Sequence, residues 1–97
     1  MTAPATFDTA APAFTTEQAQ AIVDFCEAEA TKRRAAARES VFSAECHHFA
    51  DELTHVRFAA LGVLDDLEGA HDELQRLMEE LDYLPLWRAA ASLRAVA

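Results

Sequence analysis

The fold of this chain is decided by residues 42–64, which read FSAECHHFADELTHVRFAALGVL. Apolar side chains recur there alternately four and three positions apart, and the same spacing continues as far as residue 81. We call these positions the heptad seam: Phe42, Cys46, Phe49, Leu53, Val56, Ala60, Val63, Leu67, Ala70, Leu74, Leu77 and Leu81. The spacing predicts α-helix, either as the core face of an amphipathic helix or as the seam of a coiled coil.

Residues 58–64 separate these two possibilities because they are apolar on every side of a helix. A bare two-stranded coiled coil would leave half of this segment in water, so a bundle of at least three or four helices fits better. Gly62 lies within the segment and would allow one neighbouring helix to approach closely.

The composition supports an all-α domain. The 97 residues include only two glycines and three prolines, and they include 22 alanines. Alanine favours helix but buries little apolar area, so a core of this kind is hard to complete within one short chain. We therefore expect a helical hairpin, extended to a small helix bundle and completed by self-association.

The expected domain occupies residues 15–97, after a flexible N-terminal arm at residues 1–14. Thr15 and Gln18 have the spacing of a capping box, which predicts a helix start. The basic stretch 32–38 suits a helix C-terminus, so we expect a turn near 38–40 in preference to one continuous helix through residues 15–68.

After that turn, Ser40 or Ser43 could cap the second helix. An acidic segment with Gly69 predicts a break before a third helix at residues 70–82. Pro85 should end that helix and begin a short last one, whose apolar face holds Leu86, Ala90 and Leu93. Tyr83 and Trp87, beside the break, are predicted to be exposed aromatic residues.

Charge and cysteine content narrow the functional classes. Seventeen acidic and eight basic residues give a net charge of -9, which disfavours nucleic acid as a partner. Neither an export signal nor a membrane span is visible, so we expect a cytoplasmic protein with both cysteines reduced and Cys46 packed on the seam. The leading interpretation is a non-catalytic protein that acts through homo-oligomerisation and through binding a second protein with a basic surface.

The alternative rests on two copies of the pattern Glu-x-x-His, Glu45 to His48 and Glu52 to His55. These four residues share one face of a helix, and carboxylate with imidazole at this spacing is the ligand set of di-iron and di-manganese centres in helix bundles. The same stripe could instead be a solvated face that flanks the apolar seam. It is the only constellation here that could carry catalysis.

A turn near residues 39–40 would place residues whose numbers sum to about 79 opposite one another, and so Glu27 opposite Glu52. One carboxylate from the first helix with Glu-x-x-His from the second resembles the half-site of small helical-hairpin members of the ferritin-like group. The resemblance is confined to this motif and does not extend to the second copy. It implies an iron or manganese site shared between two subunits, with ferroxidase-like chemistry. The candidate ligands are Glu27, Glu52 and His55, with Glu45 and His48 as alternative or entry-site ligands.

Overall fold

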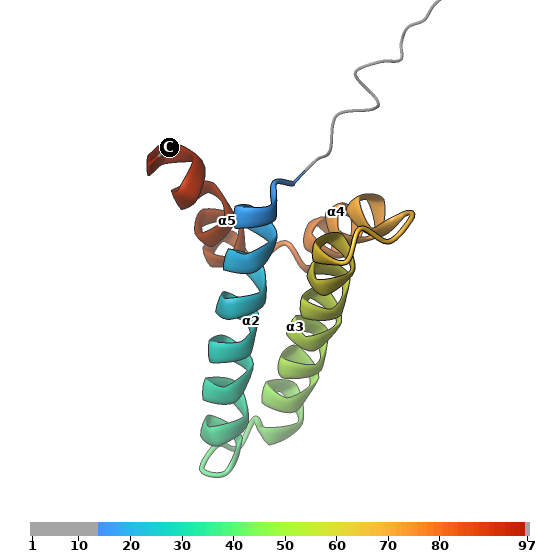
Figure 1. Cartoon of the computed structure of the whole chain (residues 1–97). Coiled ribbons are helices and arrows are strands. Elements are labelled where there is room, and N and C mark those ends of the chain that lie inside the picture. The colour runs from blue at the N-terminus through green and yellow to red at the C-terminus, as the bar shows by residue number, and fades with distance from the viewer. Residues whose placement is uncertain (1–13, 97) are drawn as a thin grey trace, which may run out of the picture.

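The computed structural model describes residues 14–96, and the side chains of residues 14–91. This part of the chain forms four helices, which are α2 (Thr16–Ala37), α3 (Ser43–Leu64), α4 (Ala70–Leu81) and α5 (Leu84–Val96). No strand occurs within 14–96, so the all-α prediction is confirmed. The long helices α2 and α3 run antiparallel as a hairpin (Figure 1).

Helix α2 begins as its sequence predicts. The backbone N–H of Gln18 donates to Thr15 Oγ1 at 3.0 Å, and the backbone N–H of Thr15 donates to Gln18 Oε1 at 2.9 Å. This capping box satisfies backbone donors that have no partner inside the helix. Of the predicted arm, residues 1–13 lie outside the described residues, and Phe14 is buried in the core.

The chain turns at residues 38–42, which confirms the hairpin and rules out a single helix through this region. The predicted cap is wrong, however. The N-cap residue of α3 is Phe42, and its side chain makes no capping hydrogen bond. Ser40 acts inside the turn instead, where its Oγ accepts a hydrogen bond from the backbone N–H of Phe42 at 2.9 Å.

Helix α3 ends in a Schellman motif, in which two backbone N–H groups return to carbonyls of the last turn. Leu67 donates to the Gly62 carbonyl at 2.9 Å, and Asp66 donates to the Val63 carbonyl at 3.0 Å. Asp66 holds the left-handed conformation with φ 59°, a position that usually carries glycine. Gly62 acts as predicted, because a Cβ added there would stand 3.3 Å from Ala70 Cβ at the start of α4.

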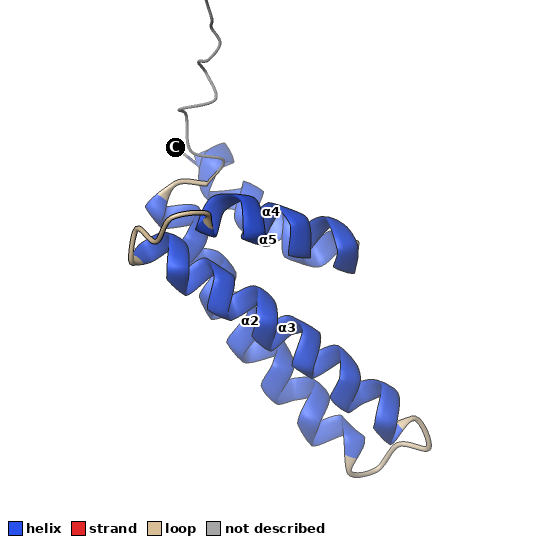
Figure 2. Cartoon of the chain, turned by 90° about the vertical axis from the view of Figure 1, so that its right-hand side faces the viewer, coloured by secondary structure: helices blue, strands red, loops and turns tan. Residues whose placement is uncertain are grey.

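Helices α4 and α5 form a second layer on one side of the hairpin (Figure 2). Helix α4 packs on α3, and α5 packs on α2. They are joined at Asp82 and Tyr83, and Pro85 lies in the first turn of α5 as predicted. Within residues 14–96, no helix combines the length and the apolar character that crossing a lipid bilayer would require.

One hydrophobic core draws on all four helices. Nine of the twelve heptad seam residues are buried in it or lie at its edge in α3 and α4, but Phe42 and Leu67 are 62% and 60% exposed. The segment 58–64 is not buried on every side either, because Phe58 is 59% exposed. On the last helix, Leu86 and Ala90 are buried as predicted, and the side chain of Leu93 lies outside the described part.

The length of the hairpin determines which of its surfaces stay open. Helices α2 and α3 have 22 residues each, whereas α4 and α5 have 12 and 13. Helices α4 and α5 cross the hairpin obliquely (Figure 2), and the link between them meets α3 at Phe49, so the part of α3 from Ser43 to Phe49, about 9 Å at 1.5 Å per residue, extends beyond the second layer. The uncovered length is at the end that holds the turn (Figures 1 and 2). We call residues 31–52 the hairpin tip.

Candidate functional site

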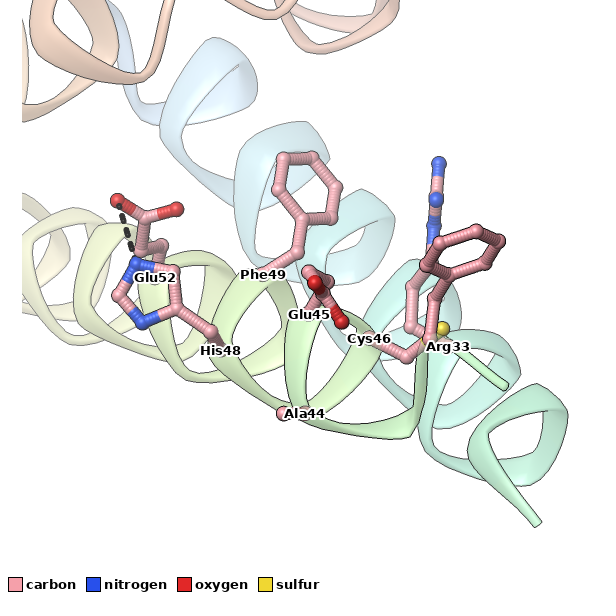
Figure 3. A pocket seen from close by; sticks show the side chains of 8 residues that line it. Arg33, Ala44, Glu45, Cys46, His48, Phe49 and Glu52 are labelled. Carbon is pink, nitrogen blue, oxygen red and sulfur yellow. Dashed lines mark ion pairs between the residues drawn. The ribbon is translucent and has the colours of Figure 1, made fainter. Parts of the chain in front are cut away.

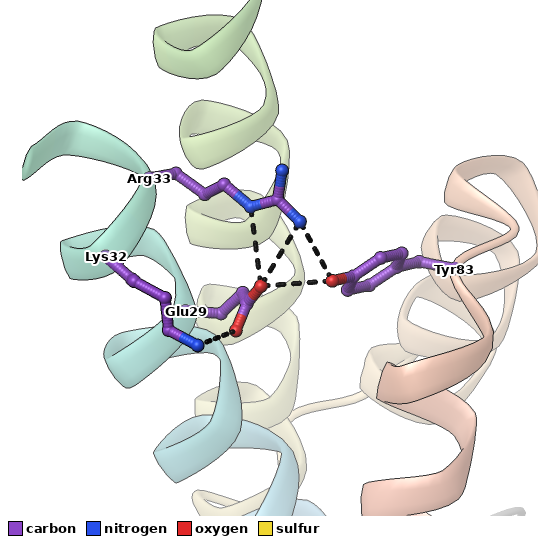
Figure 4. Close-up of polar contacts among 4 residues, drawn as sticks. All are labelled: Glu29, Lys32, Arg33 and Tyr83. Carbon is purple, nitrogen blue, oxygen red and sulfur yellow. Dashed lines mark hydrogen bonds and ion pairs between the residues drawn. The ribbon is translucent and has the colours of Figure 1, made fainter. Parts of the chain in front are cut away.

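The second layer ends over the hairpin at a network of polar side chains, shown in Figure 4. The Tyr83 hydroxyl donates to Glu29 Oε2 at 3.0 Å and accepts from an Arg33 Nη at 3.0 Å. The same Arg33 contacts Glu29 Oε2 at 3.3 Å, and Lys32 lies 3.7 Å from the other oxygen of Glu29. Only 13% of the Glu29 side chain is exposed, so these contacts compensate a largely buried charge.

Aromatic rings complete this junction. The ring of Phe49 from α3 meets the Tyr83 ring edge-on, with 4.9 Å between their centroids. The Arg33 guanidinium lies 4.7 Å from the centre of the Phe49 ring, a cation–π contact. Residues of α2, of α3 and of the link between α4 and α5 are therefore held together at one place.

The electrostatics of Glu29 follow from this environment. Burial alone would raise the pKa of its carboxyl group, because it disfavours the charged form. Hydrogen bonds from Tyr83 and Arg33, with the positive charges of Lys32 and Arg33, outweigh burial and hold that pKa below its ordinary value. Glu29 is thus an anion at neutral pH, and it anchors the second layer to α2.

An open groove of about 630 Å³ follows directly on this junction toward the tip (Figure 3). It is lined by Arg33, Phe42, Ala44, Glu45, Cys46, His48, Phe49 and Glu52. Val41, the sequence neighbour of Phe42, is 92% exposed, and it is the most exposed of the large apolar residues in the described chain. The groove and its surroundings thus combine apolar side chains with two carboxylates and one imidazole.

Three of the five predicted metal ligands line one groove in the structure. Glu45, His48 and Glu52 line the groove, and His48 Nε2 lies 3.7 Å from Glu52 Oε2. His55 lies elsewhere, in a groove between α3 and α4 that Phe58 also lines.

Glu27 does not face Glu52. It pairs with Arg57 at 3.1 Å, in a different groove that Cys26 and Thr54 also line. The two glutamates therefore line different grooves, with Glu27 beside Arg57 and Glu52 beside Arg33. Within residues 14–91, no three His, Cys, Asp or Glu side chains converge as a metal site would require. A metal site shared between two subunits stays a prediction.

The cysteines differ in their surroundings. Cys26 is fully buried, and burial raises the pKa of its thiol to about 12, against the opposing charge of Arg57. Cys46 is only half-buried at the groove, so its predicted packing on the seam is incomplete. Both are free thiols, as expected.

The junction around Tyr83 escaped the sequence analysis. The prediction that Tyr83 and Trp87 are exposed is wrong, since both are partly buried against the core. The sequence contained one usable signal, the spacing of Glu29 and Arg33 four residues apart, which suits an ion pair on one helix face. Nothing in the sequence connects that pair with a tyrosine 50 positions further along the chain.

No protein family, curated protein or solved structure in the comparisons matches this chain. The geometry described above is therefore the basis for any statement about its function.

Proposed function

We propose that the protein acts non-catalytically, by binding protein surfaces through the open side of its hairpin tip. The proposal includes self-association and a second protein partner. One observation carries it: Phe42, which lines the groove, and its sequence neighbour Val41 are exposed, and no residue of α4 or α5 lines that groove. Soluble proteins expose single apolar residues routinely, but an apolar groove next to two large exposed side chains is typical of an interaction surface.

The energetic benefit of covering this surface is substantial. Fully burying a valine or phenylalanine side chain stabilises a complex by about 1.5 to 3 kcal/mol. Val41 is almost wholly exposed and Phe42 is exposed over more than half of its area, so covering both would contribute about 3 kcal/mol. This is enough to change an association constant by about a hundredfold.

The groove is also held in a defined shape before any partner arrives. Phe49 is fixed between Tyr83 and the Arg33 guanidinium, and Arg33 is fixed in turn by Glu29. Side chains that are already ordered lose little conformational entropy on binding. The polar junction therefore supports the groove as a binding surface in addition to anchoring the second layer.

The proposal is tested with Val41→Ser and Phe42→Ser combined in one variant, which we expect to weaken association without lowering thermal stability, because both side chains are exposed. Sedimentation velocity measures self-association, and quantitative co-purification from the native host measures binding of a second protein. Leu67→Ser is the matched control, since Leu67 is exposed to the same degree as Phe42 but lies outside the tip. A tip variant that associates as strongly as the control would refute the proposal.

A further inference from the structure

The net charge of this chain is unevenly distributed. The hairpin tip holds four bases and four acids, so it carries no net charge with histidine neutral; these residues are Lys32, Arg33, Arg34, Arg38, Glu39, Glu45, Asp51 and Glu52. The rest of the sequence holds four bases and thirteen acids and therefore carries the whole charge of -9. Two copies of this chain repel each other outside the tip, whereas the tips can approach without that cost.

The apolar pattern at the tip suits a partner helix that has the same heptad spacing. Phe42, Cys46 and Phe49 are the first three positions of the heptad seam, and each of them is at least partly exposed. The next seam position, Leu53, is fully buried in the core of its own chain. The seam thus continues past the core into the groove, and a second helix with the same period would fit against it.

We infer that the occupant of the open side of the tip is a second copy of this chain, packed tip against tip and antiparallel about a two-fold axis. The inference rests on the proposed function and names the partner for it. We prefer this to a parallel arrangement because α4 and α5 lie on one side of the hairpin (Figure 2), so a parallel pair would set the second layers of both copies against each other. In the antiparallel arrangement each tip lies beyond the end of its partner's second layer. The two-fold symmetry makes the part of α3 that extends beyond the second layer equally long in both copies.

The expected dimer is weak. The overlap extends from the junction at Phe49 to the start of α3 at Ser43, which is about 9 Å at 1.5 Å per residue. This is well below the length that an interface of about 800 Å² per partner would need, so we expect dissociation at micromolar or higher concentration. The charge distribution also predicts how the dissociation constant of the dimer depends on salt. Salt screens the repulsion between two bodies of charge -9, so the dimer should become tighter as salt is added.

The first experiment is sedimentation velocity of the full chain from about 10 to about 500 µM, at about 50 mM and about 500 mM NaCl. We expect a monomer–dimer equilibrium that shifts to dimer at the higher salt concentration. Phe42→Ser should raise the dissociation constant about tenfold or more, and Leu67→Ser should leave it unchanged. A dimer that weakens as salt is added would overturn the inference.

The second experiment measures the orientation of the two copies by pulsed electron spin resonance. A nitroxide is attached to Glu39→Cys at the turn or to Glu68→Cys at the far end, each combined with Cys46→Ser. Cys26 stays unlabelled because it is fully buried. A sedimentation run first verifies that Cys46→Ser alone still dimerises.

The antiparallel tip-to-tip dimer predicts about 15 to 25 Å between two labels at residue 39, and about 50 Å or more between two labels at residue 68. A long distance between labels at residue 39 with a short one at residue 68 would overturn the tip-to-tip arrangement but not self-association. A chain that stays monomeric up to the highest concentration, while its tip variant still loses a second protein, would overturn this inference and leave the proposed function intact. No association of any kind would refute both.

Discussion

Removing the Tyr83 hydroxyl should destabilise the protein by a predictable amount. In Tyr83→Phe the ring keeps its edge-on contact with Phe49, so only the two hydrogen bonds at 3.0 Å, to Glu29 and from Arg33, are lost. Hydrogen bonds to charged groups are worth about 1.5 to 3 kcal/mol. Glu29 and Arg33 keep each other as partners and Glu29 also keeps Lys32, so for the two bonds together we expect a loss of only about 1.5 kcal/mol. For a domain of this size that corresponds to about 6 to 12 °C in Tm.

The same loss should depend on pH in a specified direction. The pKa of Glu29 is lowered in the folded state, so the ionised carboxylate stabilises the fold. This contribution is fully present above the pKa of an unfolded glutamate, about 4.3, and is lost as pH falls through the lower folded pKa. The difference in unfolding free energy between the native protein and Tyr83→Phe should therefore be constant from about pH 5 to pH 7 and shrink at lower pH.

Urea denaturation at a series of pH values measures this difference, and a double-mutant cycle with Glu29→Gln isolates the interaction between the two side chains. We expect a coupling energy of about 1 kcal/mol at pH 7. A coupling energy of zero, or a loss that is the same at pH 3 and pH 7, would refute the role assigned to this junction.

Four further outcomes are expected. Leu53→Ala, at a fully buried position of the hairpin core, should lower the free energy of unfolding by about 2 to 5 kcal/mol in urea denaturation. Asp66→Gly should raise it by about 0.5 to 1 kcal/mol, since aspartate there has φ 59°, and a loss of stability would contradict the assigned strain. Adding Fe(II), Mn(II) or Zn(II) to chelator-treated protein should leave Tm unchanged, whereas a rise in Tm that His55→Ala abolishes would establish the metal alternative. A thiol reagent should modify Cys46 at once in the native protein and Cys26 only after unfolding, as absorbance of the released chromophore would show.

The elements of the fold were accessible from the sequence because each is specified locally. Thr15 and Gln18 form the capping box that their spacing predicts, and Pro85 begins the last helix. Gly62 marks the close approach of α4 before any tertiary contact is known. Caps, breakers and periodicity act within a few residues of one another, so a single sequence is enough to place them.

The site was harder to predict from the sequence because it depends on which side of the hairpin each residue occupies. Numbering across a turn places two residues at the same height on neighbouring helices, but it does not place them on the same side. Glu27 and Glu52 have numbers that sum to 79, yet Glu27 shares its groove with Arg57 while Glu52 shares another with Arg33. Arginine adds to the difficulty, because Arg57 forms an ion pair with Glu27 across the hairpin at 3.1 Å that no local pattern in the sequence predicts.

The exposed apolar residues at the tip follow from a mismatch of lengths. Helices of 12 and 13 residues cannot cover helices of 22, so part of the hairpin has no second layer within this chain. If that part served only as a solvated extension, polar residues would be expected on its open side. Phe42 and Cys46 occupy that side instead, in register with the seam that forms the core further along α3. An apolar seam that continues beyond its own cover is the pattern of a surface completed by another chain. The neutrality of the tip, in a molecule of charge -9, indicates that this other chain can be a second copy of the same protein.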